Sequence, residues 1–522
     1  MERYKQIKKE IKWYSRINLL YAIAAIFIIT YILHMIYKFH FVLWDEAVYI
    51  GIGKYIFSLG KIGLWENIRP LGIPFLFGLV WKLGLNPILW GRIVELIFAT
   101  GTIFLVYNIS KHIFNKQTAL FSTIIYAITP VFFYNSLRLM TGIPSTFFIL
   151  LAIYLFIRKY YVYAGIATSL AFIFRYPNGL VFICCLATLF VEFMLVKGPF
   201  KKKIKANSPY LKNAIKYILG FLPLVVASFA FNYYKYKSFL YPFLQASSHG
   251  ENLVHAIHET ISNLFYYPFN LIIQNYFLIF SILGFILTYF ILKKSKNIVR
   301  DSIIPISLII FLAYFTYLTN KQLRFSLSFL PFIAILAGYG IYYTIERIRT
   351  TETVTKEHWL RILPLMLLLI FSIISITSSL HEDYNSFNKF PTEKPPIVDE
   401  YYKFFPDDYK GLILTADPVH VAYSDIKIVP YYDSVEDGHK TYSRWMDNPS
   451  LAKEVSAVIF IPGPFVCFNM ECEEQLRPAL FDKIREAPNN NLKLAFEKKY
   501  EEVKSIYYVK DWISYFLLHY IT

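Results

Sequence analysis

The sequence predicts a polytopic α-helical membrane protein of about eleven transmembrane helices, followed by a C-terminal α/β domain outside the membrane. Of the 522 residues, 56% are hydrophobic and only 17% are charged. Apolar runs of about 17 to 25 residues recur from residue 17 to residue 379, and such runs can cross a hydrocarbon core of about 30 Å. Basic residues cluster at alternate turns between the runs, as the positive-inside rule predicts for cytoplasmic turns.

The spans are expected at residues 17–38, 88–109, 118–135, 143–157, 162–174, 178–196, 214–232, 268–292, 301–319, 325–345 and 359–379. The stretch 71–85 is also apolar, but its length, Pro74 and Lys82 favour a short helix lying in the membrane interface. The basic N-terminus precedes a run that is too long for a signal peptide, so we expect a retained first span and a cytoplasmic N-terminus.

This topology predicts two domains, a transmembrane domain over residues 1–380 and an extracytoplasmic α/β domain over residues 381–522. In the second domain, the β-rich runs GLILTA, IKIVPYY, SAVIFIPG and VKSIYYV alternate with helix-like stretches such as EEQLRPALFDKIREA. Cys467 and Cys472 lie in this domain, where the compartment permits a disulfide but the sequence does not decide whether one forms. The adjacent Cys184 and Cys185 are expected to pack as small apolar side chains within a span.

The formal net charge of +17 would suggest nucleic acid as the partner of a soluble protein. Here the basic residues follow the predicted cytoplasmic turns, so the charge reports topology. We therefore expect the lipid bilayer of the cell membrane, and no nucleic acid, as the environment of this multi-pass protein.

An acidic pair, Asp45 and Glu46, follows directly on the first apolar run. Ionisable side chains at the mouth of a membrane span are costly unless they face water, a counter-charge or a substrate, so the pair indicates a functional site. The alternative is a solvated helix start, with Asp45 as N-cap of a helix that carries Val48, Ile52 and Tyr55 on one face.

Several cations occur at the outer ends of spans, where the positive-inside rule disfavours them. They are Arg69, Arg138, Arg175, Lys321 and Arg324. Their positions indicate an anionic ligand on the outer face. The alternative is that these side chains reach lipid headgroups or pair with acids such as Glu66.

The acidic pair, the arginine and prolines of IRPLGIP, and Arg92 at the start of the next span form a pattern. It resembles the polyprenyl-phosphate-sugar-dependent glycosyltransferases of the GT-C architecture, including the protein O-mannosyltransferases and the lipid A aminoarabinose transferases. The segment KQLRFSLSFLPFIAILAGYG (321–340) resembles the basic-residue and proline signature of that family. The resemblance implies inverting transfer of a sugar from a polyprenyl-phosphate donor to an acceptor protein, lipid or glycan on the outer face.

The resemblance also implies residue roles. Asp45 is the expected base for the acceptor hydroxyl, with Glu46 as a supporting neighbour. The expected ligands of the donor phosphate are Arg69, Arg138, Lys321 and Arg324. A phosphate monoester has a second pKa of about 6, so it can leave without a general acid. The chain departs from the family at Gly142, where many relatives carry a second acid.

The sequence names no cofactor, although a divalent metal is compatible with the histidine cluster of the loop 233–267. Its candidate ligands are Glu251, His255 and His258. An interfacial helix with histidines at headgroup level is the favoured interpretation of this segment. The sequence contains no HExxH, CxxC or GxxxxGK[ST] pattern to indicate zinc-dependent hydrolysis or ATP use.

A multi-span membrane transporter with an outer soluble domain is the alternative function. A transporter is expected to place charged residues or broken helices near the middle of its spans. The polar residues here gather at the outer ends, which favours the transferase. An oligosaccharyltransferase catalytic subunit is disfavoured because the nearest match to its WWDxG-type motif is SRWMDNP. The sequence defines neither the sugar nor the acceptor.

Overall fold

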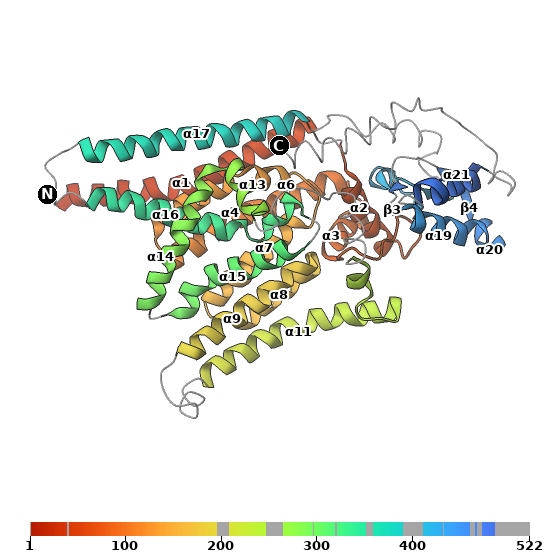
Figure 1. Ribbon diagram of the computed structural model, residues 1–522, viewed down its shortest axis with the longest axis horizontal. Coiled ribbons are helices and arrows are strands. Elements are labelled where there is room, and N and C mark those ends of the chain that lie inside the picture. The colour runs from red at the N-terminus through yellow and green to blue at the C-terminus, as the bar shows by residue number, and fades with distance from the viewer. Residues whose placement is uncertain are drawn as a thin grey trace. The chain divides into compact units, whose positions relative to one another are not determined.

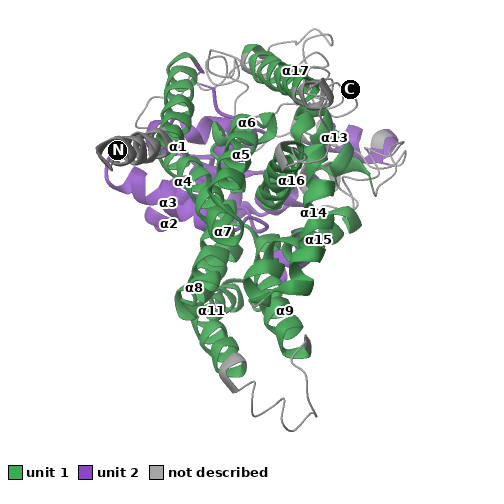
Figure 2. Ribbon diagram, turned by 90° about the vertical axis from the view of Figure 1, so that its left-hand side faces the viewer, with its two compact units in different colours: residues 1–37, 92–239, 261–390 green, residues 38–91, 240–260, 391–522 purple. Residues whose placement is uncertain are grey.

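The computed structural model describes residues 2–38, 41–195, 208–246, 265–295, 297–318, 321–350, 359–389, 411–431, 433–459, 465–466 and 472–485. The chain divides into two compact units (Figure 2). Unit 1 comprises residues 1–37, 92–239 and 261–390, and unit 2 comprises residues 38–91, 240–260 and 391–522. The first loop thus belongs to the same unit as the tail. The sequence predicted a transmembrane domain up to residue 380 and an extracytoplasmic domain after it. That division refers to the side of the membrane, which the two compact units do not test, so it stays a prediction.

Unit 1 is built mainly from apolar helices, labelled in Figures 1 and 2. They are α1 (Glu2–Lys38), α4 (Pro87–Ile113), α5 (Lys116–Ala127), α6 (Pro130–Ser136), α7 (Gly142–Ile157), α8 (Tyr161–Phe174), α9 (Leu180–Leu195), α11 (Ser208–Tyr236), α13 (Tyr266–Gln274), α14 (Phe280–Lys294), α15 (Ile298–Tyr317), α16 (Leu330–Thr350) and α17 (Trp359–Lys389). Three 3-10 turns, η1 (Tyr176–Gly179), η2 (Tyr276–Ile279) and η3 (Leu323–Ser328), lead into α9, α14 and α16.

Helical structure lies at every predicted span. Among the described residues, seven helices are long and apolar enough to cross a membrane, and the bent pair α5 and α6 would make an eighth. Helices α7 and α8 are apolar but shorter, and α16 ends in charged residues. The prediction of a polytopic helical membrane protein is therefore confirmed.

Two predicted spans, 118–135 and 268–292, are broken rather than continuous. The first bends by 63° between α5 and α6, where Pro130 opens the second helix. A proline cannot donate the backbone hydrogen bond of a continuing helix but fits the first helical turn. The second predicted span consists of α13, the turn η2 and α14.

Side-chain amides at the second break satisfy the backbone of the first. Asn275 Nδ2 donates to the Ile125 carbonyl over 3.1 Å and to Thr129 Oγ1 over 2.9 Å. Gln274 Oε1 accepts from the Val131 backbone N–H over 3.1 Å. Backbone groups within an apolar environment need such partners, because an unsatisfied one costs several kcal/mol. The two breaks therefore stabilise each other.

Small residues bring the helices of unit 1 close together. Helix α8 packs along α7 and α11, and α16 packs along α5 and α14. A Cβ atom at Gly165 of α8 would overlap the Tyr217 carbonyl of α11, and one at Gly220 would overlap the Val162 carbonyl. Such backbone contact is typical of helices that associate in a membrane, where van der Waals packing drives association.

Unit 2 combines two helices of the first loop with an α/β tail. Its helices and 3-10 and π turns are α2 (Trp44–Phe57), α3 (Gly72–Lys82), η6 (Val419–Ala422), α19 (Val435–Met446), α20 (Pro449–Ala452), η7 (Cys472–Leu476) and α21 (Arg477–Arg485). Its strands are β1 (Leu412–Thr415), β2 (Lys427–Pro430), β3 (Asp433–Ser434), β4 (Val455–Ile459) and β5 (Phe465–Val466). Strands β2, β1 and β4 form a parallel sheet in that order, and β3 pairs with β5.

The predicted α/β character of the tail is confirmed where the structure describes it. Strands β1, β2 and β4 lie in GLILTA, IKIVPYY and SAVIFIPG, and α21 lies in EEQLRPALFDKIREA. The predicted strand VKSIYYV lies outside the described residues. Cys472 is disulfide-bonded, whereas Cys467 lies outside them. Cys184 and Cys185 are buried free thiols, as predicted.

Helix α3 confirms the predicted short helix within 71–85, and its place in a membrane interface stays a prediction. It packs along α2 through glycines, because a Cβ atom at Gly53 would overlap the Pro74 carbonyl and one at Gly78 would overlap the Gly53 carbonyl. Ile73 and Phe77 are buried in this contact. The pairing leaves no room between the two helix backbones.

The chain after α2 joins the tail sheet. Gly63 donates its N–H to the Ile426 carbonyl and accepts from the Ile428 N–H, both over 2.9 Å. This places residue 63 beside β2 in a parallel bridge. Gly63 has φ +86°, and a Cβ atom there would overlap the Gly51 carbonyl, so only glycine fits. The first loop is therefore built into the tail domain.

Candidate functional site

The predicted carboxylate Asp45 and the predicted cation Arg69 are in direct contact within unit 2. Arg69 Nη2 lies 2.9 Å from Asp45 Oδ1, and Arg69 Nε lies 3.1 Å from Glu66 Oε2. The side chains of Asp45 and Glu66 are 23% and 10% exposed, so Asp45 is the more accessible acid. One guanidinium between two carboxylates leaves this group with one excess negative charge, located at the start of α2.

Electrostatics hold Arg69 in its charged form. Burial alone would lower its pKa, but the charges of Glu66, Asp45 and Tyr49 raise the pKa well above its ordinary value. The guanidinium also lies 5.4 Å from the centre of the Tyr49 ring. A cation over an aromatic ring is attracted by the ring quadrupole. Arg69 is thereby fixed in place, and it orients Asp45. These contacts match the alternative in which Arg69 pairs with acids.

Glu46 has a different position from its neighbour. Glu46 is fully buried, and its Oε2 accepts a hydrogen bond from the Leu43 N–H over 3.1 Å. A carboxylate that caps the first turn stabilises a helix because the N-terminal N–H groups lack partners within the helix. Glu46 therefore fixes the start of α2, the helix that carries Asp45.

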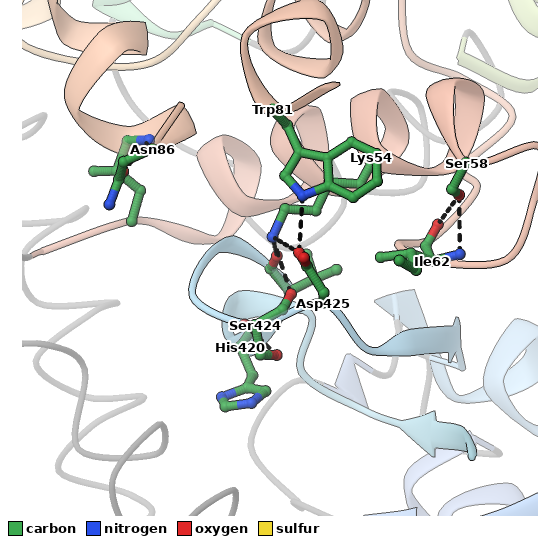
Figure 3. A network of polar contacts seen from close by, with 10 residues as sticks. Lys54, Ser58, Ile62, Trp81, Asn86, His420, Ser424 and Asp425 are labelled. Carbon is green, nitrogen blue, oxygen red and sulfur yellow. Dashed lines mark hydrogen bonds and ion pairs between the residues drawn. The ribbon is translucent and has the colours of Figure 1, made fainter. Parts of the chain in front are cut away.

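A buried lysine, Lys54, ties the other end of α2 to the tail (Figure 3). Its residue is 2% exposed, and its Nζ donates to the carbonyls of Val421 and Ser424 over 3.0 and 2.9 Å. The third contact is an ion pair of 3.0 Å with Asp425 Oδ1. Three oxygen atoms thus meet the three donors of the ammonium group.

The same carboxylate receives a second donor from the first loop. Trp81 Nε1, at the end of α3, donates to Asp425 Oδ1 over 2.9 Å (Figure 3). Burial lowers the pKa of Lys54, while the charge of Asp425 and its hydrogen bond raise it in part. A buried charge is costly unless it is paired and hydrogen-bonded. Lys54 therefore fixes α2, and with it Asp45, against η6 of the tail.

In unit 1, arginines from three loops lie near one another. Arg324 of η3 donates from Nε to Gln322 Oε1 over 2.5 Å, and its Nη1 lies 3.6 Å from Met140 Sδ. The guanidinium carbons of Arg175 and Arg324 lie 5.0 and 5.9 Å from the centre of the Phe325 ring. The two cations thus share one aromatic side chain.

Arg138 lies on the loop that also carries Met140. Its guanidinium stacks 4.4 Å from the centre of the Tyr134 ring. Buried Arg92, near the start of α4, donates from Nη1 to the Leu137 carbonyl and so fixes the chain next to Arg138. Arg175 and Arg324 therefore form one positive region of unit 1, and Arg138 lies two residues from Met140, which contacts Arg324.

A buried polar network holds these loops together. Thr146 Oγ1 donates to the Gly142 and Leu327 carbonyls over 2.8 and 3.1 Å. Asn178 links Ser145 and Ser328 through two hydrogen bonds of 2.7 Å. The network connects the starts of α7 and α9 to η3, so the arginines on these segments keep a fixed spacing.

Gly142 faces the positive region. A Cβ atom there would lie 2.8 Å from Leu327 Cδ1 and 3.7 Å from Arg175 Nη1. An acid at this position would therefore meet a guanidinium and a leucine methyl group. The missing second acid leaves the charge of this region positive.

The remaining predicted residues lie elsewhere or outside the described chain. Lys321 Nζ donates to the Thr316 and Leu318 carbonyls over 2.6 and 2.7 Å, where it satisfies the C-terminal end of α15. Burial lowers the pKa of Lys321. Glu251, His255 and His258 lie outside the described residues, and no group of three metal-ligating side chains occurs among the residues that are described.

Comparisons with known proteins bear on the fold of this site. Residues 68–226 match the family model of the dolichyl-phosphate-mannose-protein mannosyltransferases. The structure is similar to the apo oligosaccharyltransferase of Archaeoglobus fulgidus, with a TM-score of 0.58 and 14% identity over 90% of this chain and 71% of that one. It is also similar to ArnT of Cupriavidus metallidurans bound to undecaprenyl phosphate, with a TM-score of 0.55 and 12% identity over 85% and 89%.

The chain has the fold of the GT-C glycosyltransferases. A second A. fulgidus structure, AglB with an inhibitory peptide and a dolichol-phosphate, gives a TM-score of 0.55 and 14% identity over 86% and 69% of the two chains. A comparison with curated proteins finds no match. The predicted resemblance to the polyprenyl-phosphate-dependent transferases is thus confirmed. The GT-C fold extends over 85–90% of this chain in these comparisons.

Sequence reasoning missed Lys54 as part of the site's framework. Its signal was a single lysine in the otherwise apolar stretch VYIGIGKYIF, preceded by Gly51 and Gly53. An isolated charge among buried positions indicates a specific partner. The partner could not be found from the sequence, because Asp425 lies in the tail.

We expect Lys54→Met to destabilise the protein by about 1–3 kcal/mol, because two buried backbone carbonyls lose their donor. The half-exposed Asp425 adds little to this cost. Thermal unfolding of the purified protein in detergent measures the effect. The matched control is Lys61→Met, which removes an exposed lysine from the following loop. Equal stability of both variants would contradict a fixing role for Lys54.

Proposed function

We propose that this protein is a membrane glycosyltransferase that moves a sugar from a polyprenyl-phosphate donor to an acceptor, with inversion at the anomeric carbon. The observation that carries the proposal is the GT-C fold, matched over 85–90% of this chain by two different solved enzymes. The fold places an accessible carboxylate, Asp45, at the first turn of α2.

The ligands of the neighbouring structures support the donor class. ArnT is bound to undecaprenyl phosphate, and AglB is bound to a dolichol-phosphate. Both ligands are phosphorylated polyprenyl chains. We propose that the donor of this protein has the same lipid phosphate and that a cell membrane is its location.

Asp45 is the proposed base. The phosphate leaves as a stable anion, so proton removal from the acceptor hydroxyl is the one proton transfer that remains for the protein. Arg69 keeps the carboxylate oriented, and Glu46 fixes the helix on which it lies. Arg69 Nε and Nη2 already contact carboxylates, so we assign Arg69 to positioning in place of the predicted phosphate contact.

The proposed phosphate ligands are Arg324, Arg138 and Arg175. Charge develops on the departing phosphate oxygens, and guanidinium groups stabilise it through charge-assisted hydrogen bonds. Lys321 stays a candidate, although its described bonds go to backbone carbonyls. We further propose that the N-terminus is cytoplasmic and that Asp45 and the tail are extracytoplasmic, as the basic turns predict.

The proposed function predicts acceptor-dependent release of polyprenyl phosphate from a monosaccharide-linked polyprenyl phosphate. The assay uses the purified full chain in detergent with an extract of outer-surface glycans and glycolipids as acceptor, and mass spectrometry identifies the product. Transporter activity would appear differently, as solute uptake into proteoliposomes with no cleavage of the lipid. Uptake without cleavage would overturn the transferase proposal.

Arg324→Ala is expected to weaken donor binding by about 10- to 100-fold, since charge-assisted hydrogen bonds contribute about 1.5–3 kcal/mol. Arg324→Lys should recover only part of the affinity, because the bidentate fork is lost. Binding of a fluorescent polyprenyl phosphate measures both variants. Arg444→Ala, which removes an exposed arginine of α19, is the control. Unchanged donor affinity in Arg324→Ala would exclude Arg324 from the phosphate site.

A further inference from the structure

A charged hollow lies in unit 1, lined by other segments than those that carry the three arginines. It has a volume of about 930 Å³ and is formed by the C-terminal half of α14, the start of α15 and the C-terminal half of α16. Three cations line it, one from each helix: Lys294, Arg300 and Arg347. Its volume falls in the range of ligand pockets in proteins.

The charge of this hollow is positive. Asp301 is the one acid among its described lining residues. Asp301 is already engaged, because Arg300 Nε lies 2.6 Å from its Oδ1 and Ser295 donates to its Oδ2 over 2.6 Å. Lys294 and Arg347 are exposed at the rim. The hollow therefore has two cations in excess of its acid, which favours an anionic ligand.

The wall below the cations is apolar and aromatic. Leu287, Phe290 and Ile291 of α14 form one side, and Tyr339 and Tyr343 of α16 form the other. Tyr339 is held by a stacked contact with Phe114, at 4.3 Å between ring centres. Tyr343 Oη accepts from Arg347 Nε over 2.8 Å, which aims that guanidinium. The hollow thus passes from an apolar wall to a cationic rim, and two of the three helices that form it, α14 and α15, are apolar enough to span a membrane.

A smaller basic hollow adjoins this one. It has a volume of about 330 Å³ and shares Asn297 and Arg300 with the first. His112, Arg158 and Lys159 complete its polar lining. The positive surface therefore continues from α15 to the ends of α4 and α7.

We propose that the larger hollow binds an anionic phospholipid, with the phosphate at Lys294, Arg300 and Arg347 and an acyl chain along Leu287, Phe290 and Ile291. Basic hollows between transmembrane helices are suited to anionic headgroups. The positive-inside rule alone would explain separate cations at the helix ends, but not their convergence on one hollow with an apolar wall. A soluble phosphate would use the cations and leave this wall without a role.

Native mass spectrometry of the full chain in detergent, titrated with phosphatidylglycerol, tests the proposal. We expect saturable binding that Lys294→Ala and Arg347→Ala each weaken about fivefold. Lys293→Ala is the matched control, because its Nζ lies 4.5 Å from the Tyr289 ring centre and the residue does not line the hollow. Thermal unfolding in lipid-free detergent confirms that each variant is folded, and the milder Lys294→Gln or Arg347→Gln replaces the alanine variant at the same position if that one is not.

Two further titrations distinguish an anionic phospholipid from other phosphate-containing ligands. Phosphatidylcholine tests the need for net negative charge, and soluble glycerol phosphate tests the need for the acyl chain. Binding of phosphatidylglycerol in clear preference to both supports the proposal. Equal binding of phosphatidylcholine, equal affinity for glycerol phosphate, or the same loss in Lys293→Ala as in the two lining variants would overturn it. None of these outcomes depends on glycosyl transfer.

Discussion

The interaction on which the proposed site depends most is the buried ammonium group of Lys54. This group of α2 donates hydrogen bonds to two backbone carbonyls of the tail and forms an ion pair with the Asp425 carboxylate. A lysine so deeply buried is tolerable only with all its donors satisfied. Asp45 lies two to three turns earlier on the same helix, so the tail fixes the helix that carries the candidate base.

Hydrogen bonds to buried polar groups also determine where the helices of unit 1 can break. The breaks in α5–α6 and at η2 would leave backbone groups without partners, and Gln274 and Asn275 supply them. The network of Thr146, Asn178 and Ser328 does the same for the loops that carry arginines. These bonds are strong in an apolar environment because water cannot replace them. They keep irregular loops rigid enough to present cations at fixed positions.

Much of this architecture follows from sequence, and the exceptions have physical reasons. Long apolar runs identify membrane helices because their length must match the hydrocarbon core. The bend at Pro130 was not predicted. A proline explains a break in a helix, but the break is stable here because Asn275, distant in the chain, donates a hydrogen bond to Thr129 beside it. Asp45 and Arg69 were both predicted, but their contact was not. Glu46 was predicted to support Asp45 because it is the next residue, but its hydrogen bond with the Leu43 N–H was not predicted.

The central claim is that Asp45 removes the acceptor proton, and the most direct measurement compares sugar transfer and donor binding in Asp45→Asn. General-base assistance contributes about a hundred- to ten-thousandfold in rate. We predict a loss of turnover of that size with nearly unchanged donor affinity, and a smaller loss in Glu66→Gln, which alters the other carboxylate held by Arg69. A loss below about tenfold in Asp45→Asn, or an equal loss in Glu66→Gln, would contradict the assignment of Asp45 as the base.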